Sequence, residues 1–385
     1  MPTIFTRGAA SARGFGLFGG GPAGPALWSW GDNSVRQLGL GNVTLYSSPK
    51  QVGALTDWSA LSAGFNFSLA TKTNGTMWAW GRNALGQLGL GNITTYTSPK
   101  QIGALTTWAT VSAGYSHATA VKTDGTLWAW GTNVSGQLGL GNTTAYSSPK
   151  QVGALTTWST ISAGRNFSVA VKTDGTMWSW GANTYGCLGL SPLTGGYSSP
   201  VQIGAITIWS TVSAGRGANN QSSSCVATRT NGTLWTWGSN DRGQLGIGNT
   251  TNQSAPIQVG ALTTWSKARS GGNFSASVKT DGTLWMWGYN AQGQLGIGNL
   301  TSYSSPKQVG ALTTWSTISP SGNVFSLATK TNGTLWSWGY GGFGCLGLGN
   351  TYNYSSPKQV GALTTWNVAS AGGSTGTAFS LATKT

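Results

Sequence analysis

The chain has 385 residues, of which only six are acidic, and its formal net charge is +15. It contains one histidine, three cysteines and no glutamate. Acid–base catalysis relies on paired carboxylates or a histidine with a partner, and zinc sites rely on clustered cysteine and histidine, so this composition argues against both. We therefore expect a non-enzymatic protein with no cofactor and no metal.

The N-terminal segment 1–25 differs from the rest of the chain because it is rich in Gly, Ala and Pro. We predict that 1–25 forms an extended arm that binds a protein partner, a virion or scaffold protein, through Phe5, Arg7, Arg13, Phe15 and Phe18. The arm resembles the short N-terminal arms of some tailed-bacteriophage virion proteins. It lacks the apolar run of a secretory signal peptide, and we expect no transmembrane segment in the chain.

From residue 26 onward one sequence unit is repeated seven times. Tryptophan pairs spaced W-x-W begin at nearly regular intervals, at Trp28, Trp78, Trp128, Trp178, Trp235, Trp285 and Trp336. A third tryptophan in each unit accounts for the rest of the 21, at Trp58, Trp108, Trp158, Trp209, Trp265, Trp315 and Trp366. A repeat of this length is typical of helical arrays or propeller blades, and the local pattern decides between them.

The unit from Trp158 to Trp209 shows the local pattern clearly. Its β-rich segments predict strands over 159–163, 167–173, 176–180 and 200–203, with a two-residue hairpin turn at Asp174 and Gly175. A Gly-rich loop between the third and fourth strands is incompatible with a helix. We predict an all-β fold over 26–385: a seven-bladed β-propeller of four-stranded antiparallel blades.

The two ends of the repeat region are complementary. The chain stops after 379–385, where every other unit continues into a third strand, and residues 27–31 supply that missing third strand. Pairing of the N- and C-terminal strands in a shared blade closes the ring and removes its exposed edges.

The units resemble the regulator of chromosome condensation repeat. The resemblance is carried by 111–117 (VSAGYSH), 124–131 (DGTLWAWG) and 136–141 (GQLGLG), and it extends over all seven units. It implies a seven-bladed propeller whose surface binds proteins. Members of that family include a nuclear guanine-nucleotide exchange factor on chromatin, ubiquitin-ligase modules and a secreted β-lactamase inhibitor, so the resemblance alone does not choose a partner.

The basic residues follow the repeat. One ring of cations lies beside the turn between the second and third strands: Lys72, Lys122, Lys172, Arg229, Lys279, Lys330 and Lys384. We interpret these as solvated turn charges that keep the surface soluble, while a polyanion-binding site remains the weaker alternative.

The lone histidine and the three cysteines fit structural positions. His117 lies where five other units have phenylalanine, which favours a packed core residue over a general base or metal ligand. Cys187, Cys225 and Cys345 are isolated, and the first and last belong to units that are not neighbours, so we expect no disulfide between them.

Differences between the units cluster in two loops that emerge on the same side of an up-and-down blade. Because binding residues tend to occupy variable loops on a rigid scaffold, we predict a recognition surface there. Its candidate binding residues are Arg36, Arg82, Tyr115, Arg165, Tyr185, Arg216, Asn219, Arg242, Tyr289, Tyr340 and Phe343.

These features favour a virion or surface-appendage protein that is anchored by the arm and presents the variable face to a host receptor or glycan. The alternative is an intracellular scaffold or exchange-factor-like regulator that binds a small GTPase or chromatin. All seven units are short and close to one length, which leaves no room for a large inserted catalytic wedge and weighs against that alternative. An exported enzyme inhibitor is the third hypothesis, and the absence of a signal peptide ranks it last.

Overall fold

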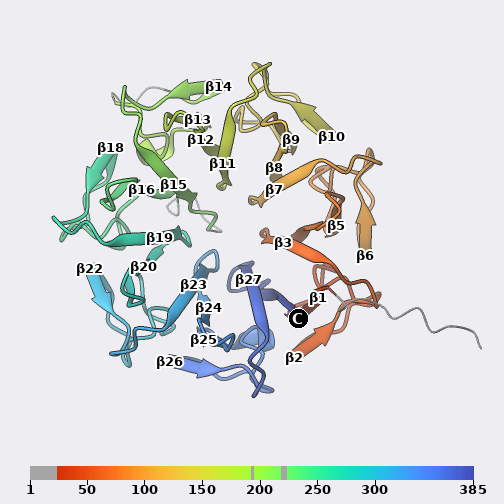
Figure 1. Cartoon of the computed structure of the whole chain (residues 1–385), viewed down its shortest axis with the longest axis vertical. Coiled ribbons are helices and arrows are strands. Elements are labelled where there is room, and N and C mark those ends of the chain that lie inside the picture. Colours follow the sequence, from red (N-terminus) through yellow and green to blue (C-terminus); the bar gives the residue numbers. More distant parts are fainter. Residues whose placement is uncertain (1–23, 192–194, 218–222) are drawn as a thin grey trace, which may run out of the picture.

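A computed structural model of the chain describes residues 24–191, 195–217 and 223–385. Seven four-stranded antiparallel sheets surround a central axis (Figure 1). We number the blades 1 to 6 from the sheet β3–β6 to the sheet β23–β26, and the seventh, closing blade has the order β27-β28-β1-β2. The predicted seven-bladed propeller is confirmed.

Each blade uses its four strands in the same order from the axis outward. The innermost strands are β3 (Trp58–Ala63), β7 (Trp108–Ala113), β11 (Trp158–Ala163), β15 (Trp209–Ala214), β19 (Trp265–Ser270), β23 (Trp315–Pro320) and β27 (Trp366–Gly372). The second strands are β4 (Phe67–Lys72), β8 (His117–Lys122), β12 (Phe167–Lys172), β16 (Ser224–Arg229), β20 (Phe274–Lys279), β24 (Phe325–Lys330) and β28 (Phe379–Lys384).

The two outer positions complete each sheet. The third strands are β5 (Met77–Gly81), β9 (Leu127–Gly131), β13 (Met177–Gly181), β17 (Leu234–Gly238), β21 (Leu284–Gly288), β25 (Leu335–Gly339) and β1 (Ala26–Gly31). The outermost strands are β6 (Tyr96–Gln101), β10 (Tyr146–Gln151), β14 (Tyr197–Gln202), β18 (Gln253–Gln258), β22 (Tyr303–Gln308), β26 (Tyr354–Gln359) and β2 (Tyr46–Gln51). Two single-turn 3-10 helices, η1 (Thr184–Gly186) and η3 (Gly342–Gly344), lie after third strands.

The hairpin between second and third strands has a three-residue loop, so the prediction of a two-residue turn is wrong. In blade 3, Lys172 N–H donates to the Thr176 carbonyl at 2.9 Å, and Gly175 N–H donates to the Lys172 carbonyl at 3.0 Å. Asp174 accepts hydrogen bonds from the backbone and hydroxyl of Thr176, and Gly175 adopts a φ of +77°. Asp174 thus closes the turn through its side chain, and Gly175 supplies the left-handed residue at its end.

The core consists of clusters between neighbouring blades. Between blades 2 and 3, for example, Leu127 and Leu138 pack against Trp158 and Trp180. Each sheet buries both of its faces in this way, which a single blade cannot do alone.

Hydrogen bonds from tryptophan join each blade to the preceding one. The second indole of every W-x-W pair donates to a carbonyl in the preceding blade at 2.9 Å, as Trp180 does to Gln137. Gly139 lies against this indole with a φ of +74°, and a Cβ there would be 2.8 Å from Trp180 Nε1. The Gly-rich loop therefore accommodates the tryptophan of the next blade.

The ring closes through the two ends of the repeat region, as predicted. β1 pairs with β28 from Ala26 opposite Lys384 to Gly31 opposite Phe379. The Trp30 indole then donates to Cys345 of blade 6 at 2.9 Å, so the closing blade is joined to its neighbour in the same way as the other six.

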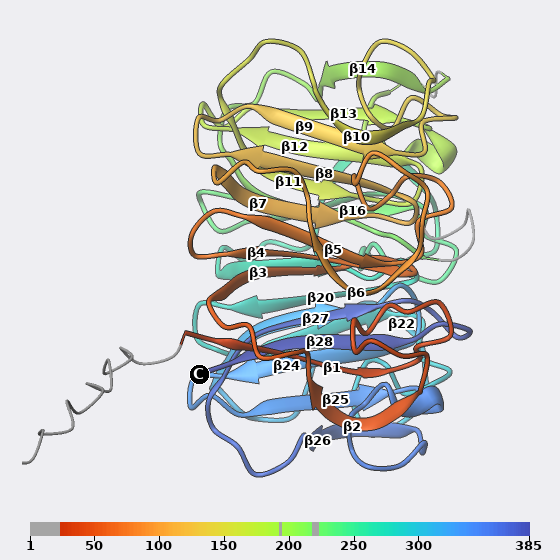
Figure 2. The same ribbon diagram turned by 90° about the vertical axis from the view of Figure 1, so that its right-hand side faces the viewer.

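The strands run between two faces (Figure 2). We call the loop face the side that carries the connections between first and second strands and between third and fourth strands. The opposite side, which carries the hairpin turns and the connections from outermost to innermost strands, is the turn face.

Candidate binding face

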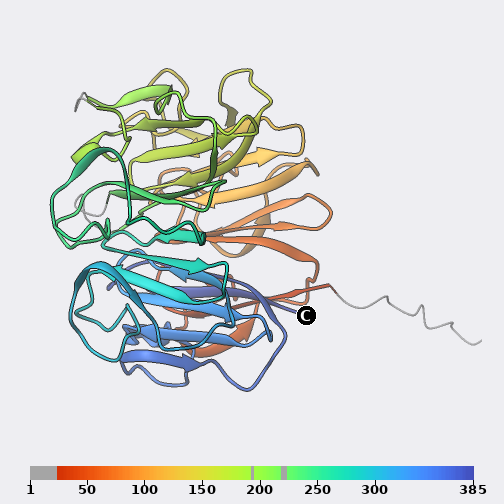
Figure 3. The ribbon, with the colours of Figure 1, turned by 60° about the vertical axis from the view of Figure 1, so that its left-hand side comes forward.

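The variable loops share one face of the ring, as the sequence predicts. In blade 1, Arg82 N–H at the start of the third-to-fourth-strand loop donates to the Asn66 carbonyl of the first-to-second-strand loop at 3.0 Å. The corresponding bond recurs in blade 2 between Thr132 and Ser116. In Figure 3 the longer loops lie on the side of the ring away from the end marked C.

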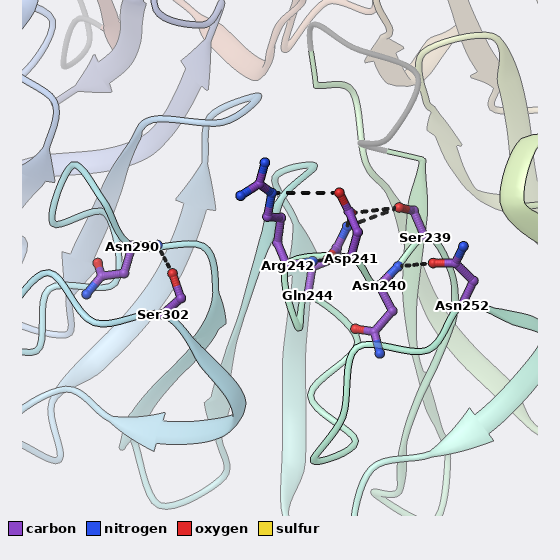
Figure 4. A network of polar contacts seen from close by, with 8 residues as sticks. All are labelled: Ser239, Asn240, Asp241, Arg242, Gln244, Asn252, Asn290 and Ser302. Atoms are coloured by element: carbon purple, nitrogen blue, oxygen red, sulfur yellow. Dashed lines mark hydrogen bonds and ion pairs between the residues drawn. The ribbon is translucent and has the colours of Figure 1, made fainter.

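An internal polar network holds the third-to-fourth-strand loop of blade 4. Figure 4 shows part of it, together with the bond from Asn290 N–H to the Ser302 hydroxyl in blade 5. The Asn240 amide donates to the carbonyls of Asn249 and Thr251, both at 3.0 Å, and its oxygen accepts from Leu245 N–H at 2.9 Å. Gln244 accepts from Arg242 N–H at 2.8 Å. A buried asparagine and glutamine thus fix the backbone while the residues between them are presented outward.

Three predicted binding residues have strained backbones. Arg36, Tyr185 and Phe343 have φ values of +70°, +57° and +60°, and among described residues only Asp57 joins them as a non-glycine with positive φ. Arg36 replaces the glycine found at this position in the other blades. Such strain persists only where surrounding structure enforces it, and it is common at functional sites.

The strain at Tyr185 and Phe343 follows from the loop cysteines. In other blades a glutamine oxygen accepts the N–H of the residue two positions earlier, as Gln87 accepts from Leu85 at 2.9 Å. Cys187 and Cys345 have no such oxygen, and their thiols instead contact the carbonyls of Ala182 and Tyr340. The loops therefore take the 3-10 turns η1 and η3, which turn Tyr185 and Phe343 into the left-handed region.

Around the mouth of the central channel, side chains from three consecutive blades stack on one another. The rings of Phe65 and Tyr115 are stacked with centroids 4.1 Å apart, and the Arg165 guanidinium lies 4.6 Å above Tyr115. Arg165 also donates to the Gly217 carbonyl at 3.2 Å, next to Arg216. Partial burial lowers the pKa of Arg165. Tyr115, Arg165 and Arg216 are thus brought together, with Phe65 as a residue that our prediction did not include.

The other predicted residues form a more dispersed outer set. Arg242 lies 5.2 Å from the Tyr289 ring and 3.7 Å from Asp241, which is the one salt bridge found among described residues. Arg82 is exposed, and Tyr340 is half-buried, which raises the pKa of its hydroxyl. Asn219 lies outside the described residues, as do the five residues predicted in the arm. The loop face therefore has a compact group at the channel mouth and separate contacts at its rim.

Three of the seven cations on the turn face are buried and the other four are half-buried, so the interpretation as solvated turn charges does not hold for those three. The Lys172, Lys279 and Lys330 residues are only 8%, 8% and 9% exposed. Their amines lie 3.7 to 3.8 Å from the ring centroid of the first tryptophan of the W-x-W pair. They also lie 4.8 to 5.0 Å from the ring centroid of the third tryptophan of the unit. Desolvation lowers the pKa values of all three amines. These cations pack on tryptophan as part of the blade.

His117 is a core residue, as predicted. It is fully buried, and its Nε2 lies 2.9 Å from the Ser168 hydroxyl, which itself donates to the Gln137 carbonyl. Ser168 must therefore accept from Nε2–H, which leaves Nδ1 as a buried nitrogen without a partner. Burial lowers the pKa of His117 to about 3.

The three cysteines are buried and free, as expected. Burial raises the pKa values of their thiols. Within the described ranges, no group of three or more His, Cys, Asp or Glu side chains could hold a metal ion, and no helix is long and apolar enough to cross a membrane.

Fold and loop face together define a closed seven-bladed propeller with a rigid scaffold and one variable face. Residues 111–382 match the family described as RCC1-like domain, and 26–71 and 74–121 match the regulator of chromosome condensation (RCC1) repeat. The chain belongs to this family of RCC1-repeat propellers.

Solved structures of the same fold include proteins from human and yeast. Human WBSCR16 aligns with a TM-score of 0.80 at 20% identity, covering 94% of this chain and 98% of its own. Yeast RCC1 (Prp20), solved bound to Kap60, aligns with a TM-score of 0.80 at 19% identity, covering 94% and 89%. A second structure, of Prp20p from Saccharomyces cerevisiae, aligns with a TM-score of 0.80 at 19% identity, covering 94% of this chain and 92% of its own. No curated protein sequence matches the chain.

Proposed function

We propose that this chain is a non-enzymatic scaffold or regulator that binds a protein partner through its loop face. The observation that carries the proposal is the stack of Phe65, Tyr115 and Arg165 at the channel mouth. Aromatic and arginine side chains held in fixed positions are the residue types that dominate binding energy at protein interfaces. All three side chains are half-buried, so part of each remains available for contact.

Charge indicates the kind of partner. The chain carries +15 overall, and the loop-face candidates include five arginines: Arg36, Arg82, Arg165, Arg216 and Arg242. Charge complementarity raises association rates and selects partners, so a partner with an acidic surface fits this face. The strained positions Arg36, Tyr185 and Phe343 add specific side chains at the rim.

The comparisons support a protein-binding role rather than a particle-display role. Yeast Prp20 has the same fold, and its structures are described as bound to Kap60 and with binding properties to Gsp1p and histones. We therefore prefer the scaffold or regulator hypothesis, with a small GTPase as the first partner class to test and chromatin as the second. The particle-display hypothesis depends on the arm, of which 1–23 lie outside the described residues, and no comparison supports it.

The test is quantitative affinity capture with three versions of the chain: wild type, the loop-face variant Y115A/R165A, and the turn-face variant L105A/L155A. Leu105 and Leu155 are 47% and 48% exposed, so this control removes apolar surface without touching the loop face. We expect the loop-face variant to lose its partner and the control to retain it. Capture that depends on the turn-face leucines and not on Tyr115 and Arg165 would refute the proposal.

A captured GTPase would then be tested for nucleotide release. Acceleration by the wild type and not by Y115A/R165A assigns exchange activity to this face. Binding without acceleration assigns a scaffold role instead.

A further inference from the structure

The innermost strands are joined around the axis by a ring of serine hydroxyls. A serine near the end of six of the seven inner strands accepts the backbone N–H of the next blade's strand, as Ser162 accepts from Ala214 at 2.9 Å. Six such bonds of 2.9 to 3.1 Å occur, with the acceptors Ser62, Ser112, Ser162, Ser213, Ser319 and Ser370. The bonds satisfy the open edges of strands that have no fifth neighbour.

The seventh bond is missing because both of its partners are changed. Arg269 occupies the position of the serine in blade 5, and Pro320 occupies the position of the donor in blade 6. Arginine has no acceptor and proline has no N–H, so neither residue leaves an unsatisfied group at this interface. The two changes compensate each other and release the Arg269 side chain from the ring.

A second arginine meets Arg269 in the channel. Arg216 projects from blade 4, and its Nη1 donates to the carbonyls of Ala63 at 2.6 Å and Ala113 at 2.8 Å, in blades 1 and 2. It therefore spans the channel at its loop-face end. Desolvation and the neighbouring charge of Arg269 lower the pKa of Arg216 to about 10, and desolvation lowers the pKa of Arg269. A guanidinium keeps its proton in proteins, so both are charged at neutral pH.

Among the described residues, no aspartate forms a salt bridge with Arg216 or Arg269. The one salt bridge found among them joins Arg242 to Asp241. Arg269 makes its hydrogen bond to a described residue through Nη1 alone, to the Ala268 carbonyl at 3.0 Å. Two neighbouring guanidiniums without a counter-charge repel each other, and they favour an anion between them.

The two arginines line a central cavity of about 470 Å³ together with all six serines of the ring. Each serine oxygen accepts an N–H, and none of these hydroxyls donates to a described residue, so their protons are available to a bound group. Along β7, Ala109 and Thr110 are exposed whereas Ala113 is buried, so the turn-face end is the more open one. Arg269 is exposed and Arg216 half-buried, so a solute in the cavity can reach both.

We propose that the central channel binds a small oxyanion of phosphate size, held by the guanidiniums of Arg216 and Arg269 and by hydroxyls of the serine ring. Guanidinium forks match the geometry of phosphate oxygens, and charged hydrogen bonds are the stronger ones. The site lies inside the ring, so it does not depend on a partner at the loop face, and the two proposals succeed or fail separately.

The test is isothermal titration calorimetry with inorganic phosphate at constant ionic strength, with chloride as the reference salt. We expect the wild type to bind one phosphate per chain. R269S loses a charge-assisted hydrogen bond, so its dissociation constant for phosphate should be at least about tenfold larger. The double variant R269S/P320A has the residues that allow the seventh ring bond. It should fold at least as stably as the wild type and bind phosphate as weakly as R269S.

The matched control is K150S, which removes one positive charge from an exposed position on the outer strand β10. It should bind phosphate as the wild type does. Three results would overturn the proposal: no phosphate binding by the wild type, unchanged binding by R269S and the double variant, or an equal loss in K150S.

Discussion

The buried histidine makes a quantitative prediction about acid stability. His117 is neutral in the fold, with its pKa lowered from 6.5 to about 3 by burial. Between these two pH values the unfolded chain binds a proton that the folded chain does not, so stability is fully present above pH 6.5 and is lost as pH falls. At about 1.4 kcal/mol per pH unit, this one residue costs about 3 kcal/mol of unfolding free energy between pH 7 and pH 4.

Substitution of His117 by phenylalanine should remove that cost. The equivalent residues Phe67, Phe167, Phe274, Phe325 and Phe379 are at most 1% exposed, so the site accepts the ring. Because H117F also removes the unpaired Nδ1, it should be at least as stable as the wild type at pH 7. At pH 4 its advantage over the wild type should be about 3 kcal/mol larger than at pH 7.

The assay is urea unfolding followed by tryptophan fluorescence at pH 7, 5.5 and 4 for both proteins. The six aspartates are common to both, so their titration cancels in the difference. A further variant, F274H in the H117F background, places one histidine at the same position in blade 5, where Ser326 replaces Ser168 as the neighbour. It should regain the pH dependence. Parallel loss of stability by the wild type and H117F down to pH 4 would refute the reasoning.

Three further predictions test the scaffold. G139A should destabilise the fold by about 2–4 kcal/mol, because it adds a clash with Trp180 to the backbone strain. The control G153A has a φ of +60° and no atom within 4 Å of its Cβ, so it should cost only about 1 kcal/mol. Thermal unfolding compares the stabilities of the two variants. R36G restores the glycine of the other blades and should raise stability by up to about 1 kcal/mol in the same assay. A thiol reagent should modify none of the three cysteines in the folded chain and all three in denaturant: Cys187, Cys225 and Cys345.

The fold could be predicted from the sequence because the repeat presents the same local pattern seven times. Strand positions, blade count and closure through 27–31 follow from tryptophan spacing and from where the repeat is interrupted. Boundaries were less accurate: the outermost strand of blade 3 begins at Tyr197, ahead of the predicted start at Pro200. Tyr197 already pairs with Gly181 of β13, and a bulge separates this pair from the one at Val201. The hairpin loop was also predicted too short.

Contacts between strands and between blades could not be derived from the pattern of one unit. The Lys172 amine sits between Trp158 and Trp178, which belong to the first and third strands of the blade, so a pattern that shows a basic residue beside a turn does not reveal the aromatic walls. The bonds of Arg216 to Ala63 and Ala113 join residues more than 100 positions apart. Such contacts depend on which blades face each other across the axis, and that follows only from the closed ring.

A repeat also makes its exceptions informative, since six equivalent positions show what the scaffold alone requires. Arg269 replaces a serine that bonds in the other six blades, and Pro320 replaces the donor that would have needed it. Arg269 alone would leave the N–H of residue 320 without its acceptor, and Pro320 alone would leave a serine at position 269 without its donor. An unpaired buried polar group costs about 1–3 kcal/mol. The paired change avoids this cost and leaves a cation in the channel, so the scaffold tolerates Arg269 but does not require it. By the same reasoning, stability does not account for Arg36, which carries strain where the other blades have glycine, and its binding role at the loop face stays a prediction.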